Sequence, residues 1–371
     1  MEAGNALNHI VEEIHRFGPI SFDRFMELAL YGPEGFYTSG GGAGRSRDFL
    51  TSPEVGPLFG AVIARALDGW WVEIGRPDPF TVVEAGAGVG ALARSILDAA
   101  PACASALRYV MVERADALRD LAAGRLPVEP PRFVPGPVVV DPDEGPIAEA
   151  GTGPVVTALA DLPAEPFDGV VLANELLDNL PVTLFERTTS GWAEVRVGTA
   201  DGGGLAEVLV EAAVRPEVEA PVGARVPVQA AARDWLRGAL AVVSRGRVVV
   251  IDYAVATTAE LATRPMTVWT YRGHAHGGGP LDWPGEQDVT CEVCIDQLAR
   301  VRPPTNNRSQ AEFLTAHGIG ELVAAAQAAW SAAAAAPDLA AVAARSRVTE
   351  AAALTDPDGI GAFRVLEWVV P

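Results

Sequence analysis

Lysine is absent from this sequence of 371 residues, and all 28 basic residues are arginine. Chemistry that needs a lysine amine is therefore excluded, including a P-loop lysine that binds phosphate and a lysine that forms a Schiff base. Positive charge is scarce as well, because 48 acidic residues leave a formal net charge of −20. Such a surface repels a phosphate backbone, so we expect no nucleic-acid partner.

Cysteine and long apolar runs are also scarce. Of the three cysteines, only Cys291 and Cys294 have the spacing of metal ligands, and no second Cys or His pair lies at a matching distance. We therefore expect ordinary burial of these thiols and no metal site. No stretch of about 18 apolar residues is present to span a membrane. The first twenty residues lack the apolar segment of a signal peptide, which predicts a cytoplasmic protein.

Four short runs of β-branched and apolar residues alternate with helical patterns. Parallel strands need long crossovers, usually helices, so this alternation predicts an α/β fold with a doubly wound parallel sheet. The four predicted strands are TVVEAG (81–86), RYVMVE (108–113), FDGVVLAN (167–174) and RVVVIDYA (247–254).

The chain divides into three predicted regions. Residues 1–78 are expected to form a helical segment that contributes to the cleft. Residues 79–256 would form the sheet core, with an antiparallel insertion near 182–212 where shorter alternating segments are split by glycine-rich turns. Residues 257–371 would be a helical, substrate-side region. Its final run, FRVLEWVV (363–370), is expected to return to the sheet as an edge strand.

A glycine loop follows the first predicted strand. Gly86, Gly88 and Gly90 allow a tight turn and a close approach to a ligand at a helix N-terminus. A G-x-G-x-G loop also occurs in dinucleotide sites, but the close spacing of the third glycine and the position of Glu84 within the strand favour S-adenosylmethionine (SAM) over NAD. Glu113, at the end of the second strand, is placed to accept hydrogen bonds from ribose hydroxyls.

The third predicted strand ends in a polar segment, ANELLDNLPV (173–182). Asn174 and Glu175 would emerge at the carboxyl edge of the sheet, where α/β proteins bind ligands. If a helical turn follows, Glu175 and Asp178 face the same side and can together bind a guanidinium group and accept its proton. The alternative is that these acidic residues only stabilise a helix N-terminus.

Ordered sequence blocks between residues 51 and 369 resemble the signature segments of the MidA family of SAM-dependent methyltransferases, which includes the mitochondrial complex I assembly methyltransferase. The resemblance implies a Rossmann-like class I SAM-dependent methyltransferase core with helical N-terminal and C-terminal additions. The matching blocks are TSPEVGPLFG (51–60), EAGAGVGAL (84–92), ANELLDNLPV (173–182), VIDYA (250–254), YRGH (271–274), PGEQDVTCEV (284–293), QAEFL (310–314) and GAFRVLEWV (361–369).

The resemblance also implies site residues in this sequence. Catalytic roles would fall to Glu175, with Asp178 or Glu54 as the second carboxylate. Cofactor binding would involve a larger set drawn from the same blocks and from the chain after the second strand: Thr51, Ser52, Pro53, Glu84, Gly86, Gly88, Gly90, Glu113, Asp161, Leu162 and Asn174.

Several positions depart from the family pattern on the side expected to face the acceptor: Asn179 replaces the usual Ala, Trp269 an Arg and Glu292 a His. The expected activity is N-methylation of a guanidine or amine, such as a protein arginine. A small-molecule or modified-peptide acceptor, or a non-catalytic assembly protein with a SAM fold, remains open. So do homodimer formation and a role of His274 and His276 in catalysis.

Overall fold

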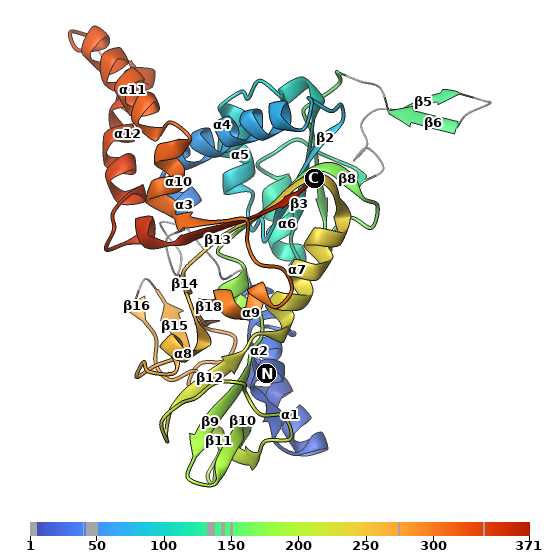
Figure 1. Ribbon diagram of the computed structural model, residues 1–371, viewed down its shortest axis with the longest axis vertical. Coiled ribbons are helices and arrows are strands. Elements are labelled where there is room, and N and C mark those ends of the chain that lie inside the picture. The colour runs from blue at the N-terminus through green and yellow to red at the C-terminus, as the bar shows by residue number, and fades with distance from the viewer. Residues whose placement is uncertain are drawn as a thin grey trace, which may run out of the picture.

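The computed structural model describes residues 6–39, 41, 51–131, 138–141, 145–148, 151–273, 275–336 and 338–371. An eight-stranded sheet forms its centre, in the order β19-β20-β13-β8-β2-β3-β7-β4 (Figure 1). The strands β13, β8, β2, β3, β7 and β4 are mutually parallel, as the alternation of apolar runs and helices predicts. The bounds are β2 Phe80–Ala85, β3 Leu107–Val112, β4 Val128–Glu129, β7 Val155–Leu159, β8 Phe167–Asn174, β13 Val243–Asp252, β19 Asn306–Ser309 and β20 Arg364–Val370.

The C-terminal strand β20 differs from the expectation of an edge strand. It pairs antiparallel with β13 on one side and with β19 on the other. The edge position belongs to β19, whose sequence NNRS is too polar and too short to predict a strand. Four consecutive buried residues, 365–368, agree with an interior position for β20.

Helices cover both faces of the sheet. The helices α4 Pro57–Glu73, α5 Ala91–Asp98 and α10 Gln310–Ala316 share one apolar core with the sheet, and α7 Ala230–Val242 and α9 Ile295–Ala299 share another. The fully buried strand β2 lies between these two layers, which agrees with its mostly apolar sequence, FTVVEA. This arrangement brings the ends of β2, β3 and β8 together at one edge.

A smaller antiparallel sheet lies at the opposite end of the molecule from the helices α11 Ile319–Ala333 and α12 Leu339–Leu354 (Figure 1). The insertion near residues 182–212 corresponds to β9, β10 and β11, and β12 continues this sheet to Val228. The sheet packs on α1 Ala6–Phe17 and α2 Phe22–Tyr31. Its strands are β1 Ile20–Ser21, β9 Thr183–Thr188, β10 Gly191–Thr199, β11 Leu205–Glu211 and β12 Arg225–Val228.

Short elements connect the two sheets. None of the described helices is long and apolar enough to cross a membrane. Cys103, Cys291 and Cys294 are free and buried, as expected. The remaining elements are α3 Ser52–Val55, α6 Asp116–Ala123, α8 Thr258–Leu261, β5 Val138–Asp141, β6 Gly145–Ala148, β14 Ala254–Val255, β15 Trp269–Arg272, β16 Ala275–His276, β17 Asp288–Thr290, β18 Val293–Cys294 and the 3-10 helices Ala104–Ala106, Leu177–Asn179 and Ile360–Ala362.

Candidate active site

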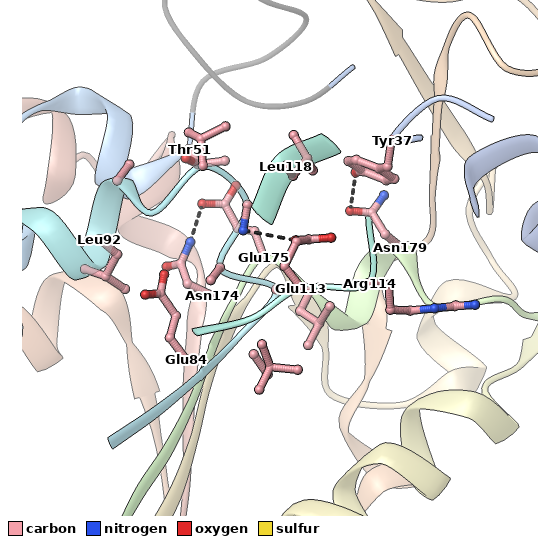
Figure 2. A pocket seen from close by; sticks show the side chains of 18 of the residues that line it. Tyr37, Thr51, Glu84, Leu92, Glu113, Arg114, Leu118, Asn174, Glu175 and Asn179 are labelled. Atoms are coloured by element: carbon pink, nitrogen blue, oxygen red, sulfur yellow. Dashed lines mark hydrogen bonds between the residues drawn. The ribbon is translucent and has the colours of Figure 1, made fainter. Parts of the chain in front are cut away.

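A cavity of about 450 Å³ opens at the carboxyl ends of β2, β3 and β8. This is the edge at which open α/β sheets bind ligands. Side chains from α2, α3, α6 and α7 complete its wall, so the N-terminal helices contribute to the same cavity as the sheet. Figure 2 shows side chains of the cavity wall from several elements, among them Glu84, Leu118 and Glu175.

Most of the residues singled out from the sequence line this cavity, whereas Ser52, Gly90 and Asp178 do not. Ser52 is fully buried behind the wall, and Asp178 is only 4% exposed. Gly90 precedes α5 with a φ of 76°, a conformation that glycine adopts at little cost, so it shapes the start of the helix. The residues that do line the cavity are Thr51, Pro53, Glu54, Glu84, Gly86, Gly88, Glu113, Asp161, Leu162, Asn174 and Glu175.

The glycine loop leaves open space at its centre. Gly88 has a φ of 52°, and a Cβ atom added there would have no neighbour within 4 Å. Its N–H group donates a hydrogen bond of 3.0 Å to Oε2 of Glu113, while Oε1 of Glu113 accepts one of 2.9 Å from the N–H of Ala115. Each carboxylate oxygen keeps a further lone pair. Burial raises the pKa of Glu113, and these hydrogen bonds lower it by less.

Glu84 is the penultimate residue of β2, next to the glycine loop. Its side chain is buried and accepts a hydrogen bond of 2.7 Å from the hydroxyl of Tyr109. Burial raises the pKa of Glu84 to about 7, because the charged form loses its hydration.

Glu175 has a backbone conformation that is unusual for a residue with a side chain, with a φ of 51° directly after β8. Its Oε1 atom accepts hydrogen bonds of 3.0 Å from the N–H of Ser52 and from Nδ2 of Asn174. Burial raises the pKa of Glu175 to about 8. Figure 2 shows its carboxyl group beside Asn174.

The expectation that Glu175 and Asp178 share one helical face is wrong. The helical turn begins only at Leu177, and the left-handed backbone at Glu175 turns the chain before it. Oδ2 of Asp178 accepts hydrogen bonds from the hydroxyls of Tyr253, at 2.5 Å, and Thr290, at 3.1 Å. Its Oδ1 is buried and has no hydrogen-bond partner among the described residues. Burial raises the pKa of Asp178 to about 6.

Two further buried acids lie beside Asp178, and the sequence reasoning missed both as site residues. Asp252 ends β13, and its Oδ2 accepts the N–H groups of Leu177 and Asp178 at 2.9 and 3.4 Å. Asp288 begins β17, and its Oδ1 accepts a hydrogen bond of 2.9 Å from Asn179. Burial raises the pKa of Asp252 well above its usual range and that of Asp288 to about 7. The blocks VIDYA and PGEQDVTCEV contained these acids and were the available signal.

Comparison with known proteins classifies the chain. Residues 62–312, about two thirds of its length, match the model of the Methyltransf_28 family of S-adenosyl-L-methionine-dependent methyltransferases. The chain belongs to this family. The expected MidA-type membership is thereby confirmed.

Relatives of this methyltransferase include mitochondrial protein arginine methyltransferases. The NDUFAF7 homolog of Drosophila melanogaster is 30% identical over 207 residues, which cover 55% of this chain and 47% of the relative. NDUFAF7 of Bos taurus is 31% identical over 203 residues, covering 52% and 44% respectively. The chain thus spans about half the length of these relatives in the alignments.

A solved structure matches nearly the whole methyltransferase chain. A Burkholderia thailandensis protein in complex with S-adenosyl-homocysteine superposes with a TM-score of 0.80 and 27% identity, over 98% of this chain and 91% of that one. A native structure from the same organism gives a TM-score of 0.78 at 26% identity. These matches confirm the expected Rossmann-like class I methyltransferase fold.

The cavity suits SAM, the cofactor of the family. Oδ1 of Asn174, a residue of the cavity wall, is a buried acceptor without a hydrogen-bond partner among the described residues, and a donor such as the ammonium group of SAM would satisfy it. Carboxyl groups from several strand ends surround the space, which favours a ligand with a sulfonium and an ammonium charge. The open position at Gly88 provides room beside the loop backbone. The expected cofactor therefore fits the residues present.

An aromatic wall from the N-terminal region covers the methyltransferase cavity and was also missed from the sequence. Tyr31 and Tyr37 stack with ring centroids 5.3 Å apart, and the guanidinium of Arg114 lies 4.6 Å from the centroid of Tyr31. Glu27 binds Arg114 through both carboxylate oxygens, at 3.1 and 2.5 Å. The hydroxyl of Tyr37 donates a hydrogen bond of 3.0 Å to Oδ1 of Asn179. Figure 2 shows the two side chains side by side.

The remaining candidates are the two histidines and Glu292. His274 lies outside the described residues, and the side chain of His276 is likewise not described. Glu292, one of the departures from the family pattern, forms an ion pair with Arg264. No group of three or more potential metal-binding side chains occurs in the described parts of the chain.

Proposed function

We propose that this protein is a SAM-dependent methyltransferase that methylates a nitrogen of a guanidine or amine acceptor, such as a protein arginine. The observation that carries the proposal is the carboxyl group of Glu175 in the wall of the cavity, with the acids Asp178, Asp252 and Asp288 behind it. The arginine methyltransferases among its relatives support this acceptor class.

The role of the chain's own residues is to bind and align the acceptor. SAM supplies an electrophilic methyl group on a positively charged sulfonium. Glu175 accepts hydrogen bonds from the cationic acceptor, with Glu54, which also lines the cavity, as the second carboxylate. Binding holds the reacting nitrogen in line with the methyl group before the reaction. The translational and rotational entropy is then lost on binding and not in the transition state, which lowers the barrier by about 7 kcal/mol or more.

Glu175 also suits the role of a proton acceptor. The nitrogen loses one N–H proton as it gains the methyl group, and a carboxylate beside it takes that proton up. A carboxyl group whose burial raises its pKa to about 8 holds a proton more readily than an exposed glutamate. When the cationic acceptor is bound, its positive charge favours the deprotonated carboxylate of Glu175, which is the form needed before methyl transfer.

Labelling with SAM that carries a radioactive methyl group tests the proposal. Wild-type protein and Glu175→Gln are incubated with an extract of the producing cells, and proteins are separated from small metabolites. We expect methylarginine in hydrolysed protein with the wild type and about 100-fold less with Glu175→Gln, while SAM affinity changes only a few-fold. Label in small metabolites alone would select the small-molecule acceptor. SAM binding without transfer to any fraction would support the non-catalytic alternative.

A further inference from the structure

The two oxygens of the Glu175 carboxyl group have different surroundings. Oε1 accepts two hydrogen bonds, from the N–H of Ser52 and from Nδ2 of Asn174. Oε2 receives no hydrogen bond from the described residues, and the side chain lines the cavity. Because one oxygen is held and the other is not, the hydrogen bonds to Oε1 determine where Oε2 points.

The N–H group of Ser52 is available because of its place in the fold. Ser52 is the first residue of α3, with Thr51 as the N-cap, and the N–H groups of a first helical turn have no partners within their own helix. Ser52 itself is fully buried and does not line the cavity. Its contribution to the site is therefore made through Glu175.

The C-terminal helices hold Ser52 in this place. The hydroxyl of Ser52 donates a hydrogen bond of 2.9 Å to Oε1 of Gln310, the first residue of α10. Gln310 is fully buried, donates from Nε2 to the carbonyl of Leu354 at 3.1 Å, and donates from its own N–H to the carbonyl of Phe363 at 2.7 Å. The amide that holds Glu175 is thus fixed by α10, by α12 and by the segment before β20.

We propose that Ser52 and Gln310 are positioning residues for Glu175. The backbone amide of Ser52 fixes Oε1 and stabilises the carboxylate form, Oε2 is left directed to the acceptor, and Gln310 fixes the amide. This inference rests on the proposed role of Glu175 and adds a function for residues outside the cavity. It also gives the C-terminal additions a role in the chemistry of the sheet edge.

Ser52→Pro removes both the N–H that binds Glu175 and the hydroxyl that binds Gln310, while the backbone at this position suits proline. Proline is favoured as the first residue of a helix, and Thr51, with φ −99° and ψ 165°, already has the extended backbone that precedes proline. Ser52→Ala keeps the N–H but removes the hydroxyl contact to Gln310. Ser309→Ala breaks the capping box of the same helix α10 at a half-buried position. It therefore controls for a general loosening of α10.

The readout is the titration of Glu175 itself, followed by NMR in protein labelled with ¹³C at the glutamate carboxyl carbon and assigned by the signal lost in Glu175→Gln. The other ionisable groups that act on Glu175 are Asp178 of the 3-10 helix, Asp252 of β13 and Tyr271 of β15. All three remain in each variant, so a shift reports the lost amide. The measurement needs no methyl acceptor, and it therefore stands apart from the test of the proposed function.

We expect Ser52→Pro to raise the titration midpoint of Glu175 by about one pH unit, since a hydrogen bond to a charged group is worth about that much. Ser52→Ala and Gln310→Leu should give smaller shifts in the same direction, and Ser309→Ala none. An unchanged midpoint in Ser52→Pro would overturn the proposal. So would equal shifts in Ser52→Pro and Ser309→Ala, because loosening of α10 would then explain both.

Discussion

At the scale of single residues, the position of Glu175 depends on a backbone conformation that sequence patterns do not reveal. Its φ of 51° separates it from the helical turn that follows, so Asp178 bonds to Tyr253 and Thr290 and does not line the cavity. Residues with side chains in this region of the Ramachandran plot often occur at functional sites. The strand end and its acidic residues were predictable, but their relative orientation was not.

The pH dependence of methyl transfer tests the role of Glu175 as a proton acceptor. Burial raises the pKa of Glu175 to about 8, and only the deprotonated carboxylate can accept a proton. We therefore expect kcat/KM, which reports the free enzyme, to rise with pH between about 6 and 8. The rate is measured with the acceptor that the labelling experiment identifies. A flat profile over this range in the wild type would contradict the assignment.

At the scale of elements, apolar runs predicted the central strands well because both sheet faces are covered by helices. Elements with little apolar content escaped prediction: β19, with the sequence NNRS, takes the edge that was assigned to the C-terminal strand. The acids Asp252 and Asp288 were missed because a carboxyl group at a strand end carries no sign of which neighbours will bury it. Only the fold brings Asp252 of β13 and Asp288 of β17 close to Asp178.

A buried group of ion pairs links β20 to the neighbouring strands β13 and β19. Glu367 is 1% exposed and accepts hydrogen bonds from Arg247 of β13 at 2.9 Å and Arg308 of β19 at 2.6 Å. Glu367→Gln removes the buried carboxylate that both guanidinium groups share, and Arg247 keeps only its pair with Glu73, so we expect the free energy of unfolding to fall by about 3 kcal/mol. Urea denaturation measures this loss.

A matched control uses an exposed pair. Glu321 binds Arg65 at 2.8 Å at the surface, and exposed pairs contribute little. Glu321→Gln should therefore leave the urea midpoint unchanged. If Glu367→Gln also leaves the urea midpoint unchanged, the buried ion pairs do not stabilise the folded sheet.

At the scale of the whole molecule, the excess of acidic residues has two parts. Most of the net charge of −20 keeps the surface hydrated, whereas a minority of acids is buried around the cavity. Composition alone predicted the absence of lysine chemistry and argued against a nucleic-acid partner. It could not separate the buried acids from the exposed ones, because that distinction depends on the packing of helices and strands on the sheet edge.

The buried acids make stability depend on pH in a predictable direction. Burial raises the pKa of Glu84 and Asp288 to about 7, that of Glu175 to about 8 and that of Asp178 to about 6, whereas in the unfolded chain these groups titrate near 4. The folded state therefore binds more protons between about pH 4 and 8, and stability falls as pH rises through this window.

Calorimetry should accordingly give a higher Tm at pH 5.5 than at pH 8. Replacing Glu84 by Gln removes one of these groups, so the decline should become shallower in Glu84→Gln. A Tm that increases from pH 5.5 to pH 8 in the wild type would show that the acids are not held in their neutral form.

The most direct test of the whole account is titration calorimetry of the purified protein with SAM and, separately, with NAD. We expect SAM to bind with a dissociation constant in the micromolar range and NAD not to bind. Gly88→Val, which places a side chain in the open space of the loop, should weaken SAM binding at least about 10-fold. Binding of NAD with no binding of SAM or S-adenosyl-homocysteine would contradict the account.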